Sequence, residues 1–502
     1  MTSESVRKPE SKSAPGTSGT SVRKPWNAFA TPAIGKAVRG ASRLLKHGGS
    51  AFPGKIVEQI DPTFLARTLA QLPLGVVLVS GTNGKTTTTR MVASMLRHLG
   101  LKVFTNPTGS NFTRGVVSAL LTEVSMSGRL DADIAVLELD EAYAVHFVRQ
   151  VKPRYALLLN VMRDQLDRFG EIDNTARLLS HVAETTTGTV VLNREDPRIA
   201  RLADVVPAGT AVRYFGLSDD LRGFFPSDDD MHAKDMPDTA ADTDAETGAA
   251  SDSASDGQAD SAAQTGTAPA IGDTLPADVA LTKVGDHHAD FLMDGRTYST
   301  DVRLEGVYNL FNAAAALAVV RAVVADLSSD HVRGRVSARL FKPSDDDLIA
   351  AVAEVTPAFG RGESIDVNGT NVELLLVKNP MGFRLSLTSF DPAGHDTMIV
   401  INDEYADGRD MSWLWDVDFT GLRGTGVGMV SGVRAWDMAL RLGYDEVPVG
   451  DVNPDIDAAV DGFLTADPGR PKRIYCTYTS MLKVRAHLGR IAKVSDAGVG
   501  RE

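Results

Sequence analysis

The sequence predicts an α/β protein with two ordered domains, a larger one with a mostly parallel sheet and a smaller one toward the C-terminus. Apolar β-rich runs alternate with helical patterns in the first part of the chain. A short polar loop with two glycines joins one of these runs to a helix, and the second part repeats the alternation with fewer elements. Such alternation is typical of βαβ units, in which helices cover both faces of a parallel sheet.

The expected elements follow the hydrophobic pattern of each segment. In the first part we expect strands over 75–80, 134–139 and 155–160 and helices over 87–99 and 174–184. In the second part we expect strands over 398–401, 428–431 and 473–477 and a helix over 435–442.

Length and composition suggest where the domains begin and end. A chain of 502 residues is too long for one compact core. The first 50 residues hold nine Lys or Arg against two Glu, without the apolar stretch of a signal peptide. We therefore expect a disordered basic tail over 1–34, a central domain over 35–325, a linker over 326–344, a C-terminal domain over 345–495 and a tail over 496–502.

An acidic, low-complexity segment interrupts the central domain at about 218–276, and we expect it to be disordered. Between Asp228 and Asp260 it holds eleven acidic residues and one Lys, a charge of −10 out of the chain's −13. The acidic balance therefore describes this insertion and not the active site, and we expect no nucleic-acid partner.

The single cysteine limits the covalent and metal chemistry. Cys476 alone forms neither an intramolecular disulfide nor a zinc site of several thiolates, so we expect no zinc. It lies in a strand-like run without His, RIYCTYT, which favours a buried structural thiol over a nucleophile. Because no uninterrupted apolar run reaches about 18 residues, we expect a cytoplasmic protein without a membrane anchor.

The strongest chemical signal is the run VVLVSGTNGKTTTTRM at 76–91. An apolar strand leads into a polar loop and a helix, so loop N–H groups and the helix N-terminus would form a positive cradle for phosphate. Val79 stands where the common pattern G-x-x-x-x-G-K-[ST] has its first glycine, and Gly81 makes the turn instead. Lys85 would reach the β and γ phosphates, and the Thr86 hydroxyl would bind Mg²⁺. The ATP-binding residues expected in this loop are Gly81, Thr82, Asn83, Gly84, Lys85, Thr86 and Thr87.

The loop sequence GTNGKTTT resembles the Mur ligase superfamily, which includes folylpolyglutamate synthases. VLELDEA at 136–142 follows in family order, and the resemblance implies that Glu138 binds Mg²⁺. NVMRDQLDRFGE at 160–171 resembles a segment in which a His helps to bind a second metal, but Gln165 stands in its place. Because a Gln carbonyl can bind Mg²⁺ or hold a water, we expect the metal site to be altered and not lost.

Two later segments extend the resemblance. LEGVYNLFNAAAALAV at 304–319 resembles a family helix that supplies an Asn for adenine, which implies this role for Asn309, with Asn312 beside it. FGRGE at 359–363 resembles the interdomain Gly-Arg pair of the family, which implies that Arg361 lies near the ATP phosphates.

The C-terminal part resembles the MurT family, the ligase-like subunit of lipid II isoglutaminyl synthase. The resemblance rests on INDEYADGRDMSWLWDVDF at 401–419, SGVRAWDMALRLGY at 431–444 and YTSML at 478–482. The chain departs from other Mur ligases, because it has no room for a nucleotide-sugar domain before Gly81 and no Lys between Lys152 and Lys234 that could be carbamylated. It also lacks the four cysteines of the zinc ribbon found in many MurT proteins.

The resemblance implies ATP-dependent amidation of the α-carboxylate of D-glutamate in lipid II, through an acyl phosphate, at the inner face of the cell membrane. Ammonia would come from a separate GatD-type glutamine amidotransferase, whose His is oriented by an Asp of the MurT subunit. Asp407, Asp410, Asp416 and Asp418 lie in the right segment. We favour Asp416, because WLWDVDF reads as a strand whose aromatic side chains could pack at an interface, and Asp410 is second.

Two other functions fit the same motifs. A stand-alone ligase of the Mur or folylpolyglutamate synthase type would use an amino acid as nucleophile and would need no glutaminase. A non-catalytic scaffold would keep the phosphate loop only to bind and regulate a partner, and Gln165 is its only support.

Overall fold

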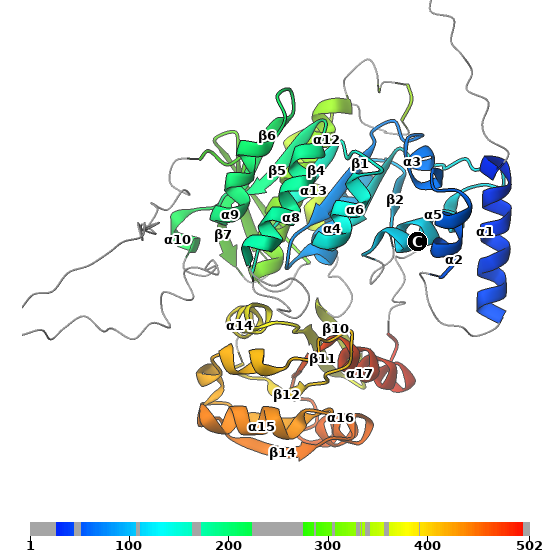
Figure 1. Ribbon diagram of the computed structural model, residues 1–502. Helices are drawn as coiled ribbons and strands as arrows, with labels where there is room; N and C mark the ends of the chain where they lie inside the picture. The colour runs from blue at the N-terminus through cyan, green and yellow to red at the C-terminus, as the bar shows by residue number, and fades with distance from the viewer. Residues whose placement is uncertain are drawn as a thin grey trace, which may run out of the picture.

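The computed structural model contains two α/β domains, stacked one above the other in Figure 1. It describes residues 27–44, 52–106, 111–162, 172–222, 275–285, 288–303, 307–327, 332, 334–336, 342–355, 361–390 and 392–494. In this part of the chain the strands form one nine-stranded and one six-stranded sheet, both mostly parallel. The predicted fold class is therefore confirmed.

The nine-stranded sheet forms the centre of the larger domain, with the strand order β2-β3-β1-β4-β5-β6-β7-β8-β9. Its strands are parallel as far as β7, and β8 and β9 continue antiparallel at one edge. The strands are β1 (Val76–Ser80), β2 (Val103–Thr105), β3 (Ile134–Glu138), β4 (Tyr155–Leu158), β5 (Thr189–Asn193), β6 (Ala211–Leu217), β7 (Val279–Gly285), β8 (His288–Met293) and β9 (Arg296–Asp301). Because β1 is buried at all five positions, neighbours on both sides and helices on both faces enclose it.

Helices cover both faces of this sheet through two separate apolar cores. One face packs against α4 (Lys85–His98), α12 (Val307–Leu327) and α13 (Asp345–Ala353). The other packs against α2 (Phe52–Ile60), α3 (Phe64–Leu69), α5 (Thr113–Glu123), α6 (Glu141–Val148), α8 (Ile172–Thr185), α9 (Pro197–Ala200) and the 3-10 helix η1 (Arg201–Val205).

Helix α12 is apolar on every side because it lies in the middle of the larger core. An 18-residue window within its residues 308–327 has a mean hydropathy of 1.8, which would suffice for a membrane span by length and composition. In the structure, however, 78% of that window is buried, and the helix packs against α4, α13 and strands β4 to β7. The helix is thus accounted for as a core element of the domain.

The C-terminal domain is built on the order β10-β11-β15-β12-β13-β14, in which only β10 runs antiparallel to its neighbour. The strands are β10 (Arg361–Val367), β11 (Thr370–Leu376), β12 (Asp396–Val400), β13 (Val427–Ser431), β14 (Val449–Asn453) and β15 (Lys472–Cys476). One face packs against α14 (Pro380–Ser389), η3 (Ser412–Asp416), η4 (Thr420–Leu422) and α15 (Ala435–Tyr444). The other packs against α16 (Ile456–Thr465) and α17 (Tyr478–Ile491).

Three predicted boundaries differ from the structure. Helix α1 (Asn27–Leu44) packs against α2 and α5, so the tail predicted over 1–34 is wrong for 27–34. A short helix, α10 (Asp219–Arg222), lies inside the predicted insertion, whose residues 223–274 are outside the described part. Helix α12 continues to Leu327, inside the predicted linker.

Candidate active site

The phosphate loop connects β1 to α4, and two glycines determine its shape. Gly81 has φ +133°, and a Cβ there would lie 2.9 Å from the Asn160 nitrogen. Gly84 has φ +83°, and a Cβ there would lie 2.5 Å from Asn312 Oδ1, in the second turn of α12. Because an L side chain would be strained and would clash at both positions, only glycine fits.

Residues after β4 hold the loop in this shape. Asn160 accepts from the main chain twice, its backbone oxygen from Thr82 N at 2.9 Å and its Oδ1 from Asn83 N at 2.8 Å. Its Nδ2 also donates to the Asn83 carbonyl at 3.1 Å. Thr82 Oγ1 accepts from Met162 N at 3.0 Å. The loop is thus positioned by the neighbouring strand end, as a preorganised binding loop requires.

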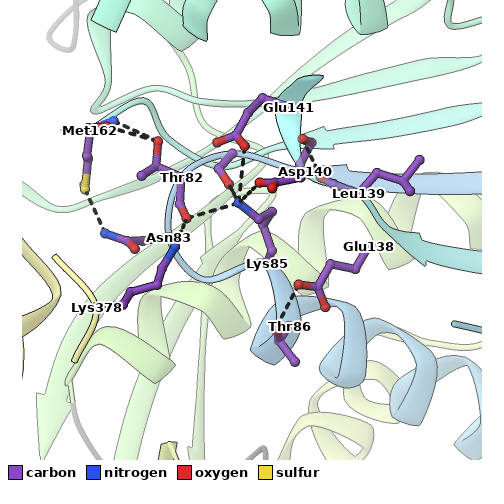
Figure 2. A network of polar contacts seen from close by, with 12 residues as sticks. Thr82, Asn83, Lys85, Thr86, Glu138, Leu139, Asp140, Glu141, Met162 and Lys378 are labelled. Atoms are coloured by element: carbon purple, nitrogen blue, oxygen red, sulfur yellow. Dashed lines mark hydrogen bonds and ion pairs between the residues drawn. The ribbon is translucent and has the colours of Figure 1, made fainter. Parts of the chain in front are cut away.

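The side chain of Lys85 folds back over this loop. Its ammonium group donates to the carbonyls of Gly81 at 2.5 Å and Thr82 at 3.2 Å. It also lies 3.3 Å from Asp140 Oδ1 and 3.5 Å from Glu141 Oε2. Figure 2 shows the contacts with Thr82, Asp140 and Glu141 converging on the Lys85 nitrogen. Lys85 is buried, so its charge is balanced mainly by these carboxylates.

Burial raises the pKa of Glu141 to about 7. The positive charge of Lys85 opposes this shift, and the neighbouring Asp140 adds to it. Asp140 and Glu141 together therefore hold less negative charge near neutral pH than two ordinary carboxylates would.

Thr86 and Glu138 form the candidate magnesium site. Thr86 Oγ1 donates to Glu138 Oε1 at 2.8 Å, which brings the first turn of α4 to the end of β3. Asn106 fixes the Glu138 main chain, because its side chain exchanges two hydrogen bonds with it, at 2.9 and 3.0 Å. Among the described residues no group of three or more His, Cys, Asp or Glu could hold a metal. A hydroxyl and a carboxylate are nevertheless hard oxygen donors that fit Mg²⁺ bound chiefly by phosphates and water.

The structure describes the other predicted site residues to different extents. Asn309 lies in the first turn of α12, one turn before Asn312, whose side chain contacts Gly84. Arg361 begins β10, but the position of its side chain is not described. Gln165 lies outside the described residues.

Two residues that the sequence analysis missed reach the phosphate loop from the C-terminal domain. Lys378 Nζ donates to the Thr82 carbonyl at 3.4 Å, and Asn379 Nδ2 donates to Asn83 Oδ1 at 3.1 Å. Both lie just after β11, in the run KNP, where Pro380 begins α14. A polar pair between a strand end and a helix N-terminus was the available signal.

The four candidate aspartates have different surroundings. Asp407 is buried and accepts from Thr479 N and Oγ1 at 2.7 and 2.5 Å. Asp410 and Asp418 are exposed and accept from the Ser412 and Thr420 amides, both at 2.9 Å. Asp416 is exposed at the end of η3.

The strand predicted for WLWDVDF is wrong, because Ser412–Asp416 is a 3-10 helix. The buried guanidinium of Arg441 donates to the carbonyls of Leu414 at 3.2 Å and Val417 at 2.6 Å. These carbonyls therefore have partners that a sheet ladder would otherwise supply.

Exposed apolar side chains form a stripe along α15. Val433, Trp436, Leu440 and Tyr444 recur at intervals of three and four residues and are 57–69% exposed. The opposite side of the helix is buried in the domain core. Trp415, half exposed, packs edge-on against Tyr444 with ring centroids 5.1 Å apart. We call these five residues the α15 stripe; a contiguous exposed apolar surface of this kind indicates an interaction site.

Two family models match the chain. The Mur ligase middle domain matches residues 79–254, and the MurT ligase C-terminal domain matches residues 376–481. The first match covers the phosphate loop and Glu138. The second covers Lys378, the four aspartates and the α15 stripe.

Similar proteins agree with these matches. The chain is 29% identical to the "Lipid II isoglutaminyl synthase (glutamine-hydrolyzing) subunit MurT" of Streptococcus pneumoniae, over 87% of this chain and 92% of that protein. It is 27% identical to the Staphylococcus aureus protein of the same name, over 83% and 87%. A crystal structure of MurF ligase from Thermotoga maritima in complex with ADP has the same fold, with a TM-score of 0.57 and 16% identity over 87% of this chain and 85% of that one.

Proposed function

Because this chain belongs to the Mur ligase family and carries a MurT-type C-terminal domain, we propose that it is the ligase subunit of a lipid II isoglutaminyl synthase. ATP phosphorylates the α-carboxylate of D-glutamate in the stem peptide of lipid II. Ammonia then displaces phosphate and leaves D-isoglutamine. Since the substrate is lipid-linked and the co-substrate is ATP, the enzyme works in the cytoplasm at the inner face of the membrane.

The observation that carries this proposal is the preorganised phosphate loop with Lys85 and the Thr86–Glu138 pair beside it. A carboxylate resists attack by an amine, and phosphorylation gives it a good leaving group. Lys85 would offset charge on the β and γ phosphates, and the first N–H groups of α4 would face them. Thr86 and Glu138 would hold Mg²⁺, which when bound neutralises charge on the phosphoryl oxygens.

The nitrogen must come from another protein. Ammonia is scarce near neutral pH, so glutamine would have to be hydrolysed by a reactive thiolate. Cys476 is buried in β15, and burial raises the pKa of its thiol, which makes it a poor nucleophile. The relatives are named as subunits of a glutamine-hydrolysing enzyme. We therefore infer a GatD-type glutaminase partner.

The α15 stripe is where we expect this partner to dock. Asp416 follows Trp415 directly, so an exposed carboxylate lies at the edge of the apolar surface. Asp416 is the first candidate to orient the His of the partner, and Asp410 the second. Asp407 is less suited, because both of its oxygens already accept hydrogen bonds inside the domain.

One experiment with two nitrogen sources tests both parts of the proposal. The purified chain, ATP, Mg²⁺ and lipid II are incubated with ammonium chloride, or with glutamine and the co-purified glutaminase, and the stem peptide is analysed by mass spectrometry. We expect amidation in both arms. Lys85→Met should lower the amidation rate at least about 100-fold in both arms, because the cation that binds the phosphates is lost. Trp436→Glu with Leu440→Glu should lower it only in the glutamine arm.

Lys102→Met is the matched control, because Lys102 is an exposed lysine of the same domain, paired with Asp131. No amidation with ammonium chloride would contradict the ligase assignment. Addition of a supplied amino acid to the substrate would instead favour a stand-alone ligase. Equal loss in both arms for the Trp436 and Leu440 variant would contradict the docking surface.

A further inference from the structure

Two lysines from different domains meet at the phosphate loop. Lys85 and Lys378 donate to the same acceptor, the Thr82 carbonyl oxygen, at 3.2 and 3.4 Å. Their nitrogens therefore lie no further apart than the sum of these two distances. Figure 2 shows Lys378 entering the loop from the side opposite to Asp140 and Glu141.

The main chain around Lys378 is held in place from both sides. Before it, Val377 N donates to the Cys476 carbonyl at 2.8 Å, which continues the pairing of β11 with β15. After it, the fully buried Asn379 caps α14 by accepting from Gly382 N at 2.7 Å. Asn379 also donates to Asn83 Oδ1 across the domain interface. Lys378 is thus presented by rigid elements, as a binding residue should be.

The two ammonium groups repel each other at this separation, and only nearby anions can offset that repulsion. Asp140 and Glu141 lie on the Lys85 side, within 3.3 and 3.5 Å of its nitrogen. The ligand that two ammonium groups at a phosphate loop would share is a polyphosphate end. The total negative charge at the site rises further when the anionic carboxylate approaches the terminal phosphoryl group.

We propose that Lys378 is a second phosphate-binding lysine, which the C-terminal domain delivers to the terminal phosphoryl group of ATP. This inference rests on the proposed function. In the transfer, a carboxylate oxygen forms a bond to the γ-phosphorus. At the same time the bond between the γ-phosphorus and the β,γ-bridging oxygen breaks, and ADP leaves with the electron pair. The ammonium group of Lys378 offsets the charge of the transferred group, which Lys85 contacts from the other side.

This role requires the two domains to be closed as they are in the structure. The ammonium group of Lys378 reaches Thr82 only because the end of β11 lies against the phosphate loop. Phosphoryl transfer would then be linked to domain closure, and water would be kept from the acyl phosphate.

Affinities for a triphosphate and a diphosphate separate this role from a structural one. The full-length chain is titrated with AMP-PNP and with ADP, each with Mg²⁺, in a calorimeter. Lys378→Met should weaken AMP-PNP binding about tenfold or more and ADP binding less than about threefold, because only the terminal phosphoryl group loses a charge-assisted contact. Lys378→Arg, which keeps the charge, should retain most of the preference for the triphosphate.

Lys483→Met is the matched control, since Lys483 is an exposed lysine of the same domain paired with Glu404. It should leave both affinities unchanged. An unchanged ratio of the two affinities in Lys378→Met would overturn the inference. Should that variant not fold, as judged by circular dichroism, Lys378→Gln takes its place with the same expected ratio. If the wild-type chain binds no AMP-PNP, the proposed function itself fails.

Discussion

The two sheets of this protein have similar parallel architecture, but the helices at their carboxyl edges begin differently. In the larger domain, α4 follows the phosphate loop, and its N-cap residue, Gly84, has no side chain to cap the helix. In the C-terminal domain, Asp407 accepts from the Thr479 amide in the first turn of α17. An internal carboxylate thus occupies at α17 the kind of position that a phosphate would occupy at α4.

A network of polar side chains links the strand ends at the carboxyl edge of the C-terminal sheet. Asn402 N donates to Thr477 Oγ1 at 2.9 Å, and Asn402 Nδ2 donates to Thr479 Oγ1 at 3.1 Å. These bonds tie the end of β12 to the end of β15. A doubly wound sheet thus offers a binding edge only where its own side chains leave the helix N-terminus to a ligand.

The largest effect expected from this comparison is at Glu138. Glu138→Gln keeps the hydrogen bond from Thr86 but removes a charged metal ligand, so the Mg²⁺ concentration needed for half-maximal ATP consumption should rise about 10- to 100-fold. The measurement is a Mg²⁺ titration with lipid II and ammonium chloride. Glu123→Gln, at an exposed position on α5, should behave as wild type. An unchanged titration of the Glu138 variant would remove Glu138 from the metal site.

The second prediction concerns the internal carboxylate. Asp407→Asn should lower the free energy of unfolding of the C-terminal domain by about 1–3 kcal/mol, because the buried carboxylate is lost as acceptor for two donors of the half-buried Thr479, while ADP affinity stays unchanged. Urea unfolding followed by tryptophan fluorescence measures the first quantity. Asp437→Asn, which breaks an exposed pair with Arg434, should cost less than about 1 kcal/mol. A loss of ADP affinity without loss of stability would show that the two sheet edges are not distinct.

The smallest effect concerns pH and the buried Asp196, which follows β5. Burial raises the pKa of Asp196 to about 6, although it accepts from the amides of Val161, Arg198 and Ile199. An acid whose pKa is raised in the folded state contributes most below its unfolded pKa, and this contribution is lost as pH rises through about 6.

Relative to Asp196→Asn, the wild-type chain should therefore lose about 1 kcal/mol of unfolding free energy between pH 5 and pH 7. Urea unfolding followed by circular dichroism at the two pH values measures this difference. Wild type gaining stability relative to the variant over the same interval would mean that the hydrogen bonds outweigh burial.

Sequence patterns predicted the parts of the site that depend on a few neighbouring residues. The order of strand, GTNGKTTT and helix indicated the phosphate loop, and Glu138 was identified because VLELDEA ends an apolar strand and resembles a family segment that follows this loop. The polar pair Lys378 and Asn379 between a strand end and a helix N-terminus was a local signal, but its contact with the phosphate loop depends on how the domains meet. The 3-10 helix at 412–416 was missed for a related reason. Arg441, which lies in a helix further along the chain, binds the carbonyls of Leu414 and Val417.

The α15 stripe also determines which events the intrinsic tryptophan fluorescence of this protein can detect. Of its four tryptophans, Trp413, Trp415 and Trp436 all belong to the C-terminal domain, and Trp26 lies outside the described residues. Trp415 and Trp436 are at least half exposed, so a protein that covers the stripe would change the polarity around two indole rings. Intrinsic emission should therefore follow subunit assembly directly, whereas nucleotide occupancy needs a label of its own.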